Sequence, residues 1–570
     1  MKQYKISIED REYREWELFD ATTHESATIE NFVPQHHKLF HGDVFEYNDS
    51  NDDRDVHIVH SILRSSVQFP AVLLLNSSIY GKRKNKFIYK CIPDNKHLPI
   101  FLVAYEQKNI GFSKNKINRY VTLQFLKWDD THPEAIIKNN IGDVNELNHF
   151  YEYQLFCKSL NASIQGFTKD AKRSIQRISS KATIDSIIET QNIPQRSEAS
   201  IFSIDGVGTQ DFDDAFSIKQ NGDEFILSIY ITNVAVWMDT LNIWDSFSQR
   251  ISSIYLPDRK RPMLPTILTN VLCSLYAGER RIALAMDIKV CNNGNVDVNY
   301  ENVAIRVEKN YTYDEMDEHS TKDYNLLRKC VARMSQTCNL MKNIDTSKDV
   351  VAYLMMFMNY YTSKVFISHK CGVFRSLHMN SDTIPDEVPN ELYKFVKIWN
   401  SSSGQYTMNF NEQHDILDIN SYIHITSPMR RLVDLLNIIE IQRVLNLYSF
   451  SNNAKEFYDN WVGRLEYINT TMRSIRKIQL DCNLLHWCND QVDLSSRKYD
   501  GYVFDKFQRS DGLFHYIVYI QSIKMASRIT VRHDLKNYSK HHFTLHIFDK
   551  KDSFKKKVRL HLHYSDCEEA

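Results

Sequence analysis

The chain has 570 residues, too many for one compact core, so we expect several domains of roughly 100–200 residues each. Its hydrophobic content of 42% and charged content of 25% are those of a folded protein and argue against wholesale disorder. Lysine and arginine number 70 and aspartate and glutamate 71, so total charge neither favours nor excludes an anionic partner. Any attraction to such a partner must come from local patches.

The ten cysteines are scattered without a CxxC pair, and the cluster of Cys482, His486 and Cys488 has a spacing that does not suit zinc. We therefore expect reduced, buried thiols. The first twenty residues are acidic and mixed, unlike a secretory or transit peptide. No stretch approaches the length needed to cross a membrane. These features predict a soluble intracellular protein, in the cytoplasm and without a membrane partner, and a monomer is the default expectation.

The N-terminal part of the chain reads as short strands. From Phe32 to Trp128, apolar or alternating runs are separated by Asn, Asp, Gly and Lys clusters, which predicts small β-barrels. We divide this part into an N-terminal extension (1–29), a first OB-type module (30–75) and a second OB-type module (76–140). We assign residues 141–195 to a helical linker, because Ile141–Ser186 has helix-like spacing. The polar, Pro-containing stretch Glu189–Ser200 precedes a new strand at Ile201.

The middle of the chain contains both the alternation of strands and the spacing of helices. Residues 196–450 are therefore expected to form a central mixed α/β domain. A hairpin is predicted where the turn Gln220–Asp223 joins two alternating runs, Ala215–Lys219 and Glu224–Ile231. Helical spacing recurs at Asp323–Met341, Val350–Ser368, Glu391–Asn400, Met429–Leu447 and Lys455–Trp487. Residues 451–496 form the helical end of this domain, and a β-rich segment, 497–570, closes the chain as a C-terminal OB-type barrel. The fold class is therefore multidomain α+β.

An acidic segment lies near the start of the central domain. It places four carboxylates, those of Asp205, Asp211, Asp213 and Asp214, within ten residues. Oxygen ligands of this kind suit Mg²⁺, which takes one or two carboxylates, keeps several waters and completes its shell with phosphate oxygens. Two such ions about 3.5–4 Å apart are a common arrangement for cleaving phosphodiesters.

Two other interpretations of the acidic segment are a solvated turn and a calcium loop. The EF-hand pattern fails, because no Gly follows the third acid and no Glu closes the required spacing. Apolar residues interleave the acids, so we expect the loop to be anchored in a core rather than solvated. These residues are Ile204, Val207, Phe212, Ala215 and Phe216.

A second segment, residues 255–265, combines Tyr255 with three cations and three prolines. An aromatic there could stack on a base for about 1–3 kcal/mol, and arginines such as Arg259 could hold phosphates with forked hydrogen bonds. In isolation, this segment could equally be a solvated basic loop.

A third segment has the pattern of a helix start. We expect Ser427 as N-cap and Pro428 at the first helical position. Arg430 and Arg431 at this start could grip a phosphate, because helix N-termini attract anions and fixed positive charge stabilises a transition state. An ordinary capped helix with surface arginines is the alternative.

The C-terminal β segment carries a basic run, Lys555–Arg559. Lys556 and Lys557 within it are candidate phosphate contacts, which would make binding of a polyanion sensitive to salt. A solvated charged face is the alternative. Histidines at 541, 542, 546, 561 and 563 fall partly on alternate positions, which fits strand faces more simply than a metal cluster.

Together, the three segments resemble the RNB exoribonuclease family in their order and approximate spacing, a family that includes bacterial ribonucleases II and R and the exosome's catalytic subunit. The resemblance extends over nearly the whole chain and is most specific at FSIDGVGTQDFDDAFSI, IYLPDRKRPMLPTILTNVLCSL and YIHITSPMRRLVDLLN. It implies a central RNB domain with flanking OB-type modules. It also implies Mg²⁺-dependent, processive 3′-to-5′ hydrolysis of single-stranded RNA to nucleoside 5′-monophosphates.

The resemblance assigns roles residue by residue. Asp205, Asp211 and Asp214 match the family's metal-binding aspartates, for two Mg²⁺ ions or Mn²⁺ in their place, and Asp213 matches the aspartate chiefly needed for catalysis. Arg430 matches the catalytic-site arginine, and Tyr255 matches an aromatic that helps to hold the RNA end.

Three features depart from the family's pattern. Asn233 stands where many members carry Asp, the helix at Met472–Leu485 lacks the counterpart of a glutamate near the RNA end, and Ser381–Tyr422 is short and divergent. The main rival hypothesis is a catalytically weak or inactive RNB-fold protein that binds RNA as a scaffold, against which the intact carboxylates argue. A third hypothesis is a metal-dependent endonuclease acting on DNA or structured RNA, which would release internal fragments.

Overall fold

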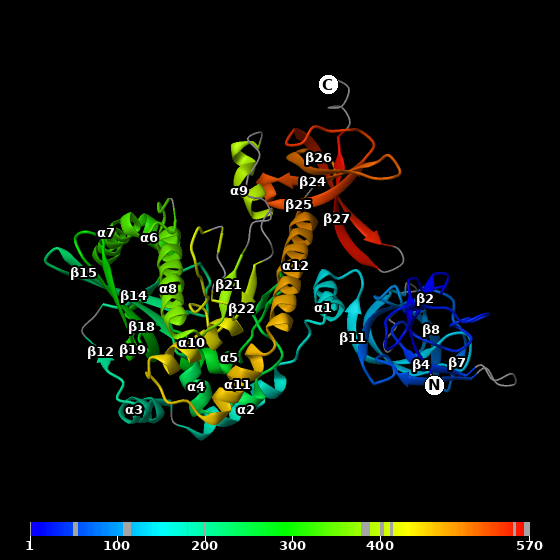
Figure 1. Ribbon diagram of the computed structural model, residues 1–570, viewed down its shortest axis with the longest axis horizontal. Helices are drawn as coiled ribbons and strands as arrows, with labels where there is room; N and C mark the ends of the chain where they lie inside the picture. Colours follow the sequence, from blue (N-terminus) through cyan, green and yellow to red (C-terminus); the bar gives the residue numbers. More distant parts are fainter. Residues whose placement is uncertain are drawn as a thin grey trace. The chain divides into compact units, whose positions relative to one another are not determined.

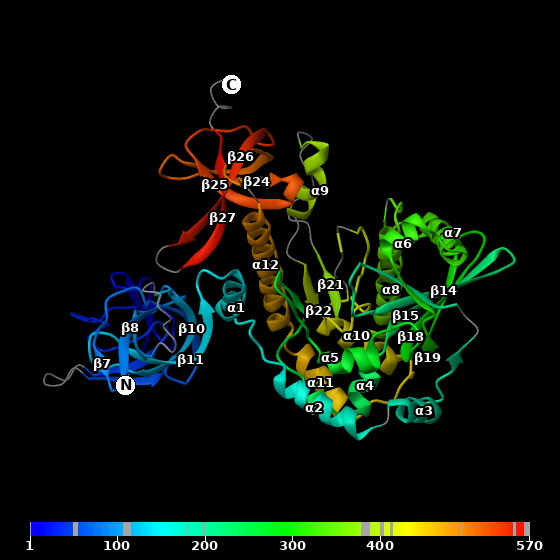
Figure 2. The same ribbon diagram turned by 180° about the vertical axis from the view of Figure 1, so that it is seen from behind.

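The computed structural model describes residues 2–48, 55–106, 116–178, 180–197, 200–341, 343–377, 388–399, 404–410, 414–415, 417–491, 493–550 and 554–563. The chain divides into two compact units (Figures 1 and 2). We call Met1–Asn161, Leu256–Asp258 and Lys477–Ala570 the flanking unit, and Ala162–Tyr255 and Arg259–Arg476 the central unit. None of the helices in the described part of the chain is long and apolar enough to span a membrane.

The flanking unit begins with two sheets. The first has the order β3-β2-β1-β4-β5 and is antiparallel, and the predicted extension of residues 1–29 supplies three of its five strands. The second has the order β6-β10-β11-β9-β8-β7, and a further pairing of β6 with β8 closes it into a barrel. The strands are β1 (Gln3–Ile8), β2 (Trp16–Asp20), β3 (Ser26–Ala27), β4 (Val44–Asn48), β5 (Asp55–His60), β6 (Gln68–Leu73), β7 (Lys82–Arg83), β8 (Lys86–Pro93), β9 (Phe101–Tyr105), β10 (Arg119–Lys127) and β11 (Glu134–Asp143).

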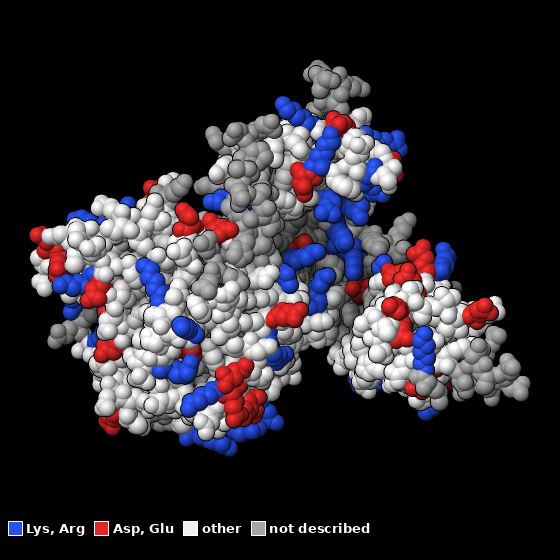
Figure 3. Space-filling view, viewed as in Figure 1, with Lys and Arg blue, Asp and Glu red and all other residues white. Residues whose placement is uncertain are grey.

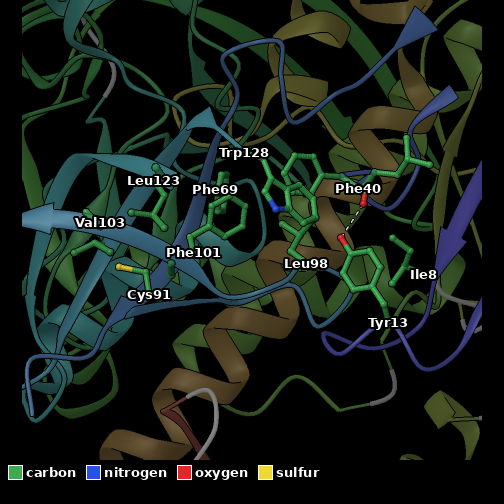
Figure 4. Close-up of a cluster of buried hydrophobic side chains, with 14 of the residues drawn as sticks. Ile8, Tyr13, Phe40, Phe69, Cys91, Leu98, Phe101, Val103, Leu123 and Trp128 are labelled. Carbon is green, nitrogen blue, oxygen red and sulfur yellow. Dashed lines mark hydrogen bonds between the residues drawn. The ribbon is translucent and has the colours of Figure 1, made fainter. Parts of the chain in front are cut away.

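These two sheets share one hydrophobic core. Alternation along β8 turns every second side chain inward, as the pleat requires. Phe40 from the first sheet's module stacks on Phe101 of the second, with ring centroids 5.9 Å apart, and Tyr13 donates a hydrogen bond of 2.8 Å to the carbonyl of Leu39 (Figure 4). The two modules therefore pack against each other through a common core.

The flanking unit ends in helix α1 (Leu147–Cys157), the C-terminal half of α12 (Leu465–Asp490) and a five-stranded sheet of order β25-β24-β23-β26-β27. Strands β25 and β27 approach each other, so this sheet is a nearly closed barrel around its own core. Its strands are β23 (Tyr499–Gln508), β24 (Phe514–Ile520), β25 (Met525–Val531), β26 (Lys540–Lys550) and β27 (Lys555–Leu562), with a short 3₁₀ turn, η3 (Gln521–Ile523). The expected architecture of N-terminal barrels, a central mixed domain and a C-terminal barrel is confirmed.

The central unit is built on a seven-stranded mixed sheet of order β12-β19-β18-β15-β14-β13-β20. The predicted hairpin is present, because β14 and β15 pair up to Asn221 and Glu224. The strands are β12 (Gln195–Arg196), β13 (Phe202–Asp205), β14 (Asp214–Asn221), β15 (Glu224–Thr232), β18 (Arg280–Val290), β19 (Val296–Arg306) and β20 (Lys309–Thr312). Two small hairpins join β16 (Ile254–Tyr255) to β17 (Lys260–Arg261) and β21 (Phe374–Ser376) to β22 (Gln405–Thr407).

Helices surround this sheet, and α7 and α8 lie against it in both views (Figures 1 and 2). Helix α10 is apolar around most of its circumference and is buried from Leu432 to Gln442, as expected for a helix enclosed on all sides. The helices are α2 (Gln165–Arg177), α3 (Ser180–Thr190), α4 (Val234–Thr240), α5 (Thr266–Leu268), α6 (Tyr313–Glu318), α7 (Lys322–Thr337), α8 (Ser347–His369), α9 (Asn390–Trp399), α10 (Leu432–Val444), α11 (Asn452–Val462) and the N-terminal half of α12. Two further turns are η1 (Trp244–Ser246) and η2 (Thr269–Cys273).

Three local expectations are wrong. The segment Lys455–Trp487 forms two helices, α11 and α12, because the chain turns at Gly463. Helix α10 begins at Leu432 rather than after Ser427, because Arg431 is extended and forms a bridge with Ser252. Val207 is 78% exposed, although Ile204, Ala215 and Phe216 are fully buried as expected.

Nine cysteines in the described residues are free. No group of three or more His, Cys, Asp or Glu side chains in that same part of the chain could hold a metal ion by itself. Within the divergent stretch Ser381–Tyr422, residues 381–387, 400–403, 411–413 and 416 lie outside the described residues.

Candidate active site in the central unit

Antiparallel pairing brings the two ends of the acidic segment together. Phe202 of β13 lies opposite Phe216 of β14, so Asp205 at the end of β13 and Asp214 at the start of β14 lie side by side at one edge of the sheet. The backbone N–H of Thr232 on β15 donates 2.9 Å to the carbonyl of Asp213, which fixes the intervening turn to the next strand. Asp205 and Asp214, which are nine positions apart in the sequence, therefore lie in one cluster.

The loop between the two strands is held by the segment that follows η2. Ser274 accepts a hydrogen bond of 2.9 Å from the backbone N–H of Phe212, whose carbonyl accepts one of 3.0 Å from Leu275. The hydroxyl of Tyr276 donates 2.6 Å to the carbonyl of Gln210. The loop is therefore anchored, as expected, although by polar contacts as much as by the core.

A cavity of about 770 Å³ opens over this cluster. All four aspartates line it, together with Tyr255, Arg430 and Arg431. It also takes in residues from α8 and the 424–431 turn. Further lining residues that bear on the chemistry are Lys260, Tyr313, Lys348, Asn359 and His424.

Two carboxylate oxygens in the cavity lack hydrogen-bond partners. The Oδ2 atoms of Asp205 and Asp214 are buried and have no hydrogen-bond partner among the described residues. Burial raises the pKa of Asp205 to about 6, and burial with the neighbouring charges of Asp205 and Asp213 raises the pKa of Asp214 well above its usual range. Two adjacent carboxylates, each with a buried oxygen that has no partner, are stabilised by a cation or a proton between them.

Asp213 and Asp211 are already partnered. Asp213 is 4% exposed and accepts hydrogen bonds from the backbone N–H of Met429 (3.2 Å) and from Nε of Arg430 (3.3 Å). Burial raises the pKa of Asp213 to about 7, while Arg430 lowers it. Asp211 forms an ion pair with Lys260, whose own pKa burial lowers to about 8.

Two of the carboxylates in the cavity fit the ligand preference of Mg²⁺. Mg²⁺ is commonly held by one or two carboxylates while water and substrate phosphate fill the rest of its shell. Asp205 and Asp214 supply such a pair, and their buried oxygens are the atoms that lack partners. The third predicted ligand, Asp211, faces Lys260 instead.

The three predicted arginines, Arg430, Arg431 and Arg259, have different surroundings. The side chain of Arg430 is 49% exposed and faces Asp213 in the cavity. Arg431 is instead held by Asp434, which is fully buried and accepts from both Nε and one terminal nitrogen of the guanidinium, the latter at 2.8 Å. Arg259 is exposed and does not line the cavity.

The remaining predicted residues divide between the units. Tyr255 is 43% exposed, and Lys260 lies 5.7 Å above its ring, across the β16–β17 hairpin. Lys556 and Lys557 belong to the flanking unit, where they line a different pocket. Asn233 lies outside the cavity lining and is buried, bonded to Asn302 and Gln442 at 2.9 Å each.

Sequence patterns missed two cavity residues. Tyr313 follows the capping residue Thr312 at the start of α6, and burial beside Asp214 and Asp205 raises its pKa to about 12. Lys260 was one of three cations in a row, and only its position opposite Tyr255 in the hairpin distinguishes it.

Comparisons with known proteins identify the domain and the fold. Residues 195–350 match the RNB domain family. Ribonuclease R of Mycoplasmopsis pulmonis is 31% identical over 175 residues, which is 30% of this chain and 24% of that relative, so the matched stretch spans about a quarter of its length.

Two solved structures share the fold. Mycoplasma genitalium RNase R, in complex with ribose-methylated single-stranded RNA, superposes with a TM-score of 0.69 at 15% identity and covers 98% of this chain and 97% of that one. Yeast Ssd1, a pseudonuclease, superposes with a TM-score of 0.58 at 13% identity, over 93% of this chain and 78% of that one. The chain therefore carries an RNB domain and is a distant homologue of bacterial ribonuclease R, whose fold it shares.

Proposed function

We propose that the chain is a Mg²⁺-dependent 3′-to-5′ exoribonuclease that hydrolyses single-stranded RNA processively to nucleoside 5′-monophosphates, working as a monomer. The observation that carries the proposal is the pair of buried, unpartnered carboxylate oxygens of Asp205 and Asp214 beside Arg430. A buried charge without a partner is costly, and such groups persist mainly where function requires them.

The residues divide the work between binding and charge stabilisation. Asp205 and Asp214, with Asp211 after release from Lys260, would hold one or two Mg²⁺ ions, which supply an activated water and neutralise the phosphate. Asp213 holds Arg430 in place through Nε, and the terminal nitrogens of the guanidinium would donate to a phosphate oxygen where negative charge develops. Tyr255, at the rim, offers a face for the terminal base.

The second candidate function is an RNA-binding scaffold without catalysis, and one observation favours it. The fold is shared with yeast Ssd1, a pseudonuclease, nearly as fully as with RNase R. Retention of all four aspartates and Arg430 in one cavity argues for the enzyme. A metal-dependent endonuclease would share the same chemistry and differ only in its products.

The test is a time course with 5′-labelled single-stranded RNA, with Mg²⁺ or with EDTA, using the wild type and Asp213→Asn. Asp297→Asn, an exposed change on β19 of the same sheet, is the matched control. We expect shortening from the 3′ end that requires both Mg²⁺ and Asp213. Internal fragments would indicate the endonuclease, and tight binding without any cleavage would indicate the scaffold.

A further inference from the structure

Lys260 lies in the cavity beside one of the predicted metal ligands. Its ammonium group forms an ion pair with Asp211, and both residues line the cavity over the acidic cluster. The sequence predicts Asp211 as a ligand of Mg²⁺, together with Asp205 and Asp214. In the structure, a positively charged group of the chain itself already accompanies the carboxylate of Asp211.

The β16–β17 hairpin fixes the position of Lys260. Lys260 lies directly opposite Tyr255 in this hairpin, and its Nζ is 5.7 Å from the centroid of the Tyr255 ring. Ser253, just before the hairpin, donates its backbone N–H to the carbonyl of Arg430 at 2.9 Å. The Oγ of Ser253 accepts a hydrogen bond of 3.0 Å from the backbone N–H of Met263, which follows the hairpin. Backbone pairing and anchored ends therefore position this lysine.

The ion pair of Lys260 and Asp211 differs from the surface pairs of this chain. Figure 3 shows Lys and Arg side chains interspersed with Asp and Glu over much of the visible surface, where solvent and salt screen their charges. Lys289 and Glu224 form an exposed pair, with side chains 52% and 38% exposed. The side chains of Lys260 and Asp211 are 30% and 12% exposed, so their attraction is screened less and the pair is harder to separate.

The charges in the cavity balance with a single divalent ion. Four aspartates line the cavity, and two of them already pair with Lys260 and Arg430. Asp205 and Asp214 are the other two, and each has a buried oxygen without a partner among the described residues. When both are ionised, their combined charge equals that of one Mg²⁺ ion.

Two further cations line the cavity without changing this balance. Arg431 pairs with the fully buried Asp434. Lys348 is exposed, so solvent screens its charge. A second divalent ion at Asp211 would have to displace the ammonium group of Lys260, and the cavity would then hold more positive than negative charge before RNA enters.

The carboxylates are grouped in the same way in space. Asp205 and Asp214 lie at the adjoining ends of β13 and β14, whereas Asp211 belongs to the loop between these strands. No three His, Cys, Asp or Glu side chains of the described residues, which include all four aspartates, are grouped so that they could hold one metal ion. Asp205 and Asp214 therefore form a two-carboxylate site without Asp211.

We propose that Lys260 takes the place of a second divalent ion, so that the site holds one Mg²⁺ at Asp205 and Asp214 rather than two. Lysine and Mg²⁺ both serve to stabilise negative charge on a phosphoryl group. An ammonium group has three N–H donors, so Lys260 can stay on Asp211 and donate to a phosphate oxygen at the same time. This role of Lys260 rests on the proposed function and decides between the one-ion and two-ion sites that it leaves open.

The experiment counts the Mn²⁺ ions bound by the full chain, by electron paramagnetic resonance, with Mn²⁺ as the probe. Titrations are run without RNA and with a single-stranded RNA whose phosphorothioate linkages resist hydrolysis, because phosphate groups complete the shell of the ion. Ions bound by the RNA alone are subtracted.

The variants separate the charge of Lys260 from its bulk. Lys260→Met removes the charge, Lys260→Arg keeps it, and Lys260→Met/Asp211→Asn removes both members of the pair. Lys289→Met, which breaks the exposed pair with Glu224, is the matched control. Thermal unfolding checks the fold of each variant, and the wild-type count tests the proposal even where a variant is unstable.

We expect about one Mn²⁺ per chain in the wild type, in Lys260→Arg and in Lys289→Met, and a second ion in Lys260→Met, because Asp211 then lacks its cation. Lys260→Met/Asp211→Asn should bind one ion again. Two Mn²⁺ ions about 3.5–4 Å apart couple magnetically, so the spectrum distinguishes a second ion in the cavity from one bound elsewhere.

The proposal is overturned if the wild type with RNA binds two coupled ions or none, or if Lys260→Met binds no more ions than the wild type. Cleavage of unmodified RNA with Mg²⁺ is measured separately. A wild-type chain that binds one ion, gains a second in Lys260→Met and cleaves nothing would contradict the proposed function, while Lys260 would still take the place of the second ion.

Discussion

The cavity over the acidic cluster and a layer of buried polar groups, defined here as Asp434, Asn437 and the groups bonded to them, contain the same kinds of residue in different states. In the cavity, Asp205 and Asp214 present buried oxygens without described partners. In the polar layer, Asp434 accepts a hydrogen bond from a terminal nitrogen of Arg431 and another from the backbone N–H of Ser427, each at 2.8 Å. Asn437 likewise bonds both the N–H and the carbonyl of Val373 at 2.9 Å.

This contrast separates structure from function. A satisfied buried network specifies a fold, whereas a buried charge that lacks its partner implies a ligand that will supply one. Arg430 and Arg431 are neighbours in the sequence and both line the cavity, but Arg430 pairs with Asp213 whereas Arg431 pairs with the fully buried Asp434. The predictions below separate the two regions by experiment.

The largest expected effect is on stability. Arg431→Met leaves the buried Asp434 without its cation, so the free energy of unfolding should fall by about 3–5 kcal/mol. Urea denaturation measures the change, with Arg306→Met on the exposed edge of β19 as control. If Arg431→Met unfolds like the wild type and instead loses RNA affinity, Arg431 contacts RNA as the sequence predicts.

Arg430→Ala should instead lower the cleavage rate and leave stability nearly unchanged. We expect single-turnover cleavage of saturating RNA to fall about 10²–10³-fold, because a fixed charge opposite the developing negative charge is lost. The thermal midpoint should change far less than in Arg431→Met, since Arg430 is half exposed. Arg306→Ala is the control, and unchanged cleavage in Arg430→Ala would remove this residue from the reaction.

Folding stability should also depend on pH, through His414 and His424. Burial lowers the pKa of His414 to about 4 and that of His424 well below its usual range, so both rings are neutral in the folded state. The unfolded chain takes up these protons below about pH 6.5, and stability is therefore lost as pH falls from 6.5 toward 4. At pH 5 the loss from His414 alone is about 2 kcal/mol.

The measurement is the free energy of unfolding at pH 7 and pH 5. His414→Phe should flatten its pH dependence, whereas His319→Asn at an exposed site should leave it unchanged. An equal slope in His414→Phe would show that another group carries the acid sensitivity.

The smallest effect is at the rim. Tyr255→Ala should weaken binding of single-stranded RNA by about 1 kcal/mol, the low end of the range for stacking, because the ring is already partly exposed. Tyr255→Phe keeps the flat face and should bind as the wild type does. Fluorescence anisotropy with labelled RNA in EDTA measures both, and equal losses in the two variants would rule out stacking.

Local patterns predicted most of the architecture, because strands and helices follow from periodicity within one segment. The β14–β15 hairpin and helices α7, α8 and α9 are present within a few residues of their predicted bounds. The strands at residues 3–27 were missed. There β1 pairs with β2 and also with β4, which lies beyond the predicted boundary at residue 29.

The four aspartates and Arg430 were predictable as a set and do line one cavity. The partner of each charge was not predictable, since it depends on which side chains become buried and on contacts made only in the folded chain. Nothing near Arg431 in the sequence shows that its partner will be buried, and Lys260 meets Asp211 only after the β16–β17 hairpin folds over the loop.

The most direct test of the account is to measure RNA affinity and cleavage together in Asp213→Asn. Single-turnover release of nucleotide from 3′-labelled RNA should fall about a thousandfold, since the group that positions Arg430 is lost. The dissociation constant for the same RNA should change by less than about threefold, because the base-holding rim is intact. A wild-type protein that binds this RNA with Mg²⁺ present and releases no nucleotide would contradict the account and leave the scaffold in its place.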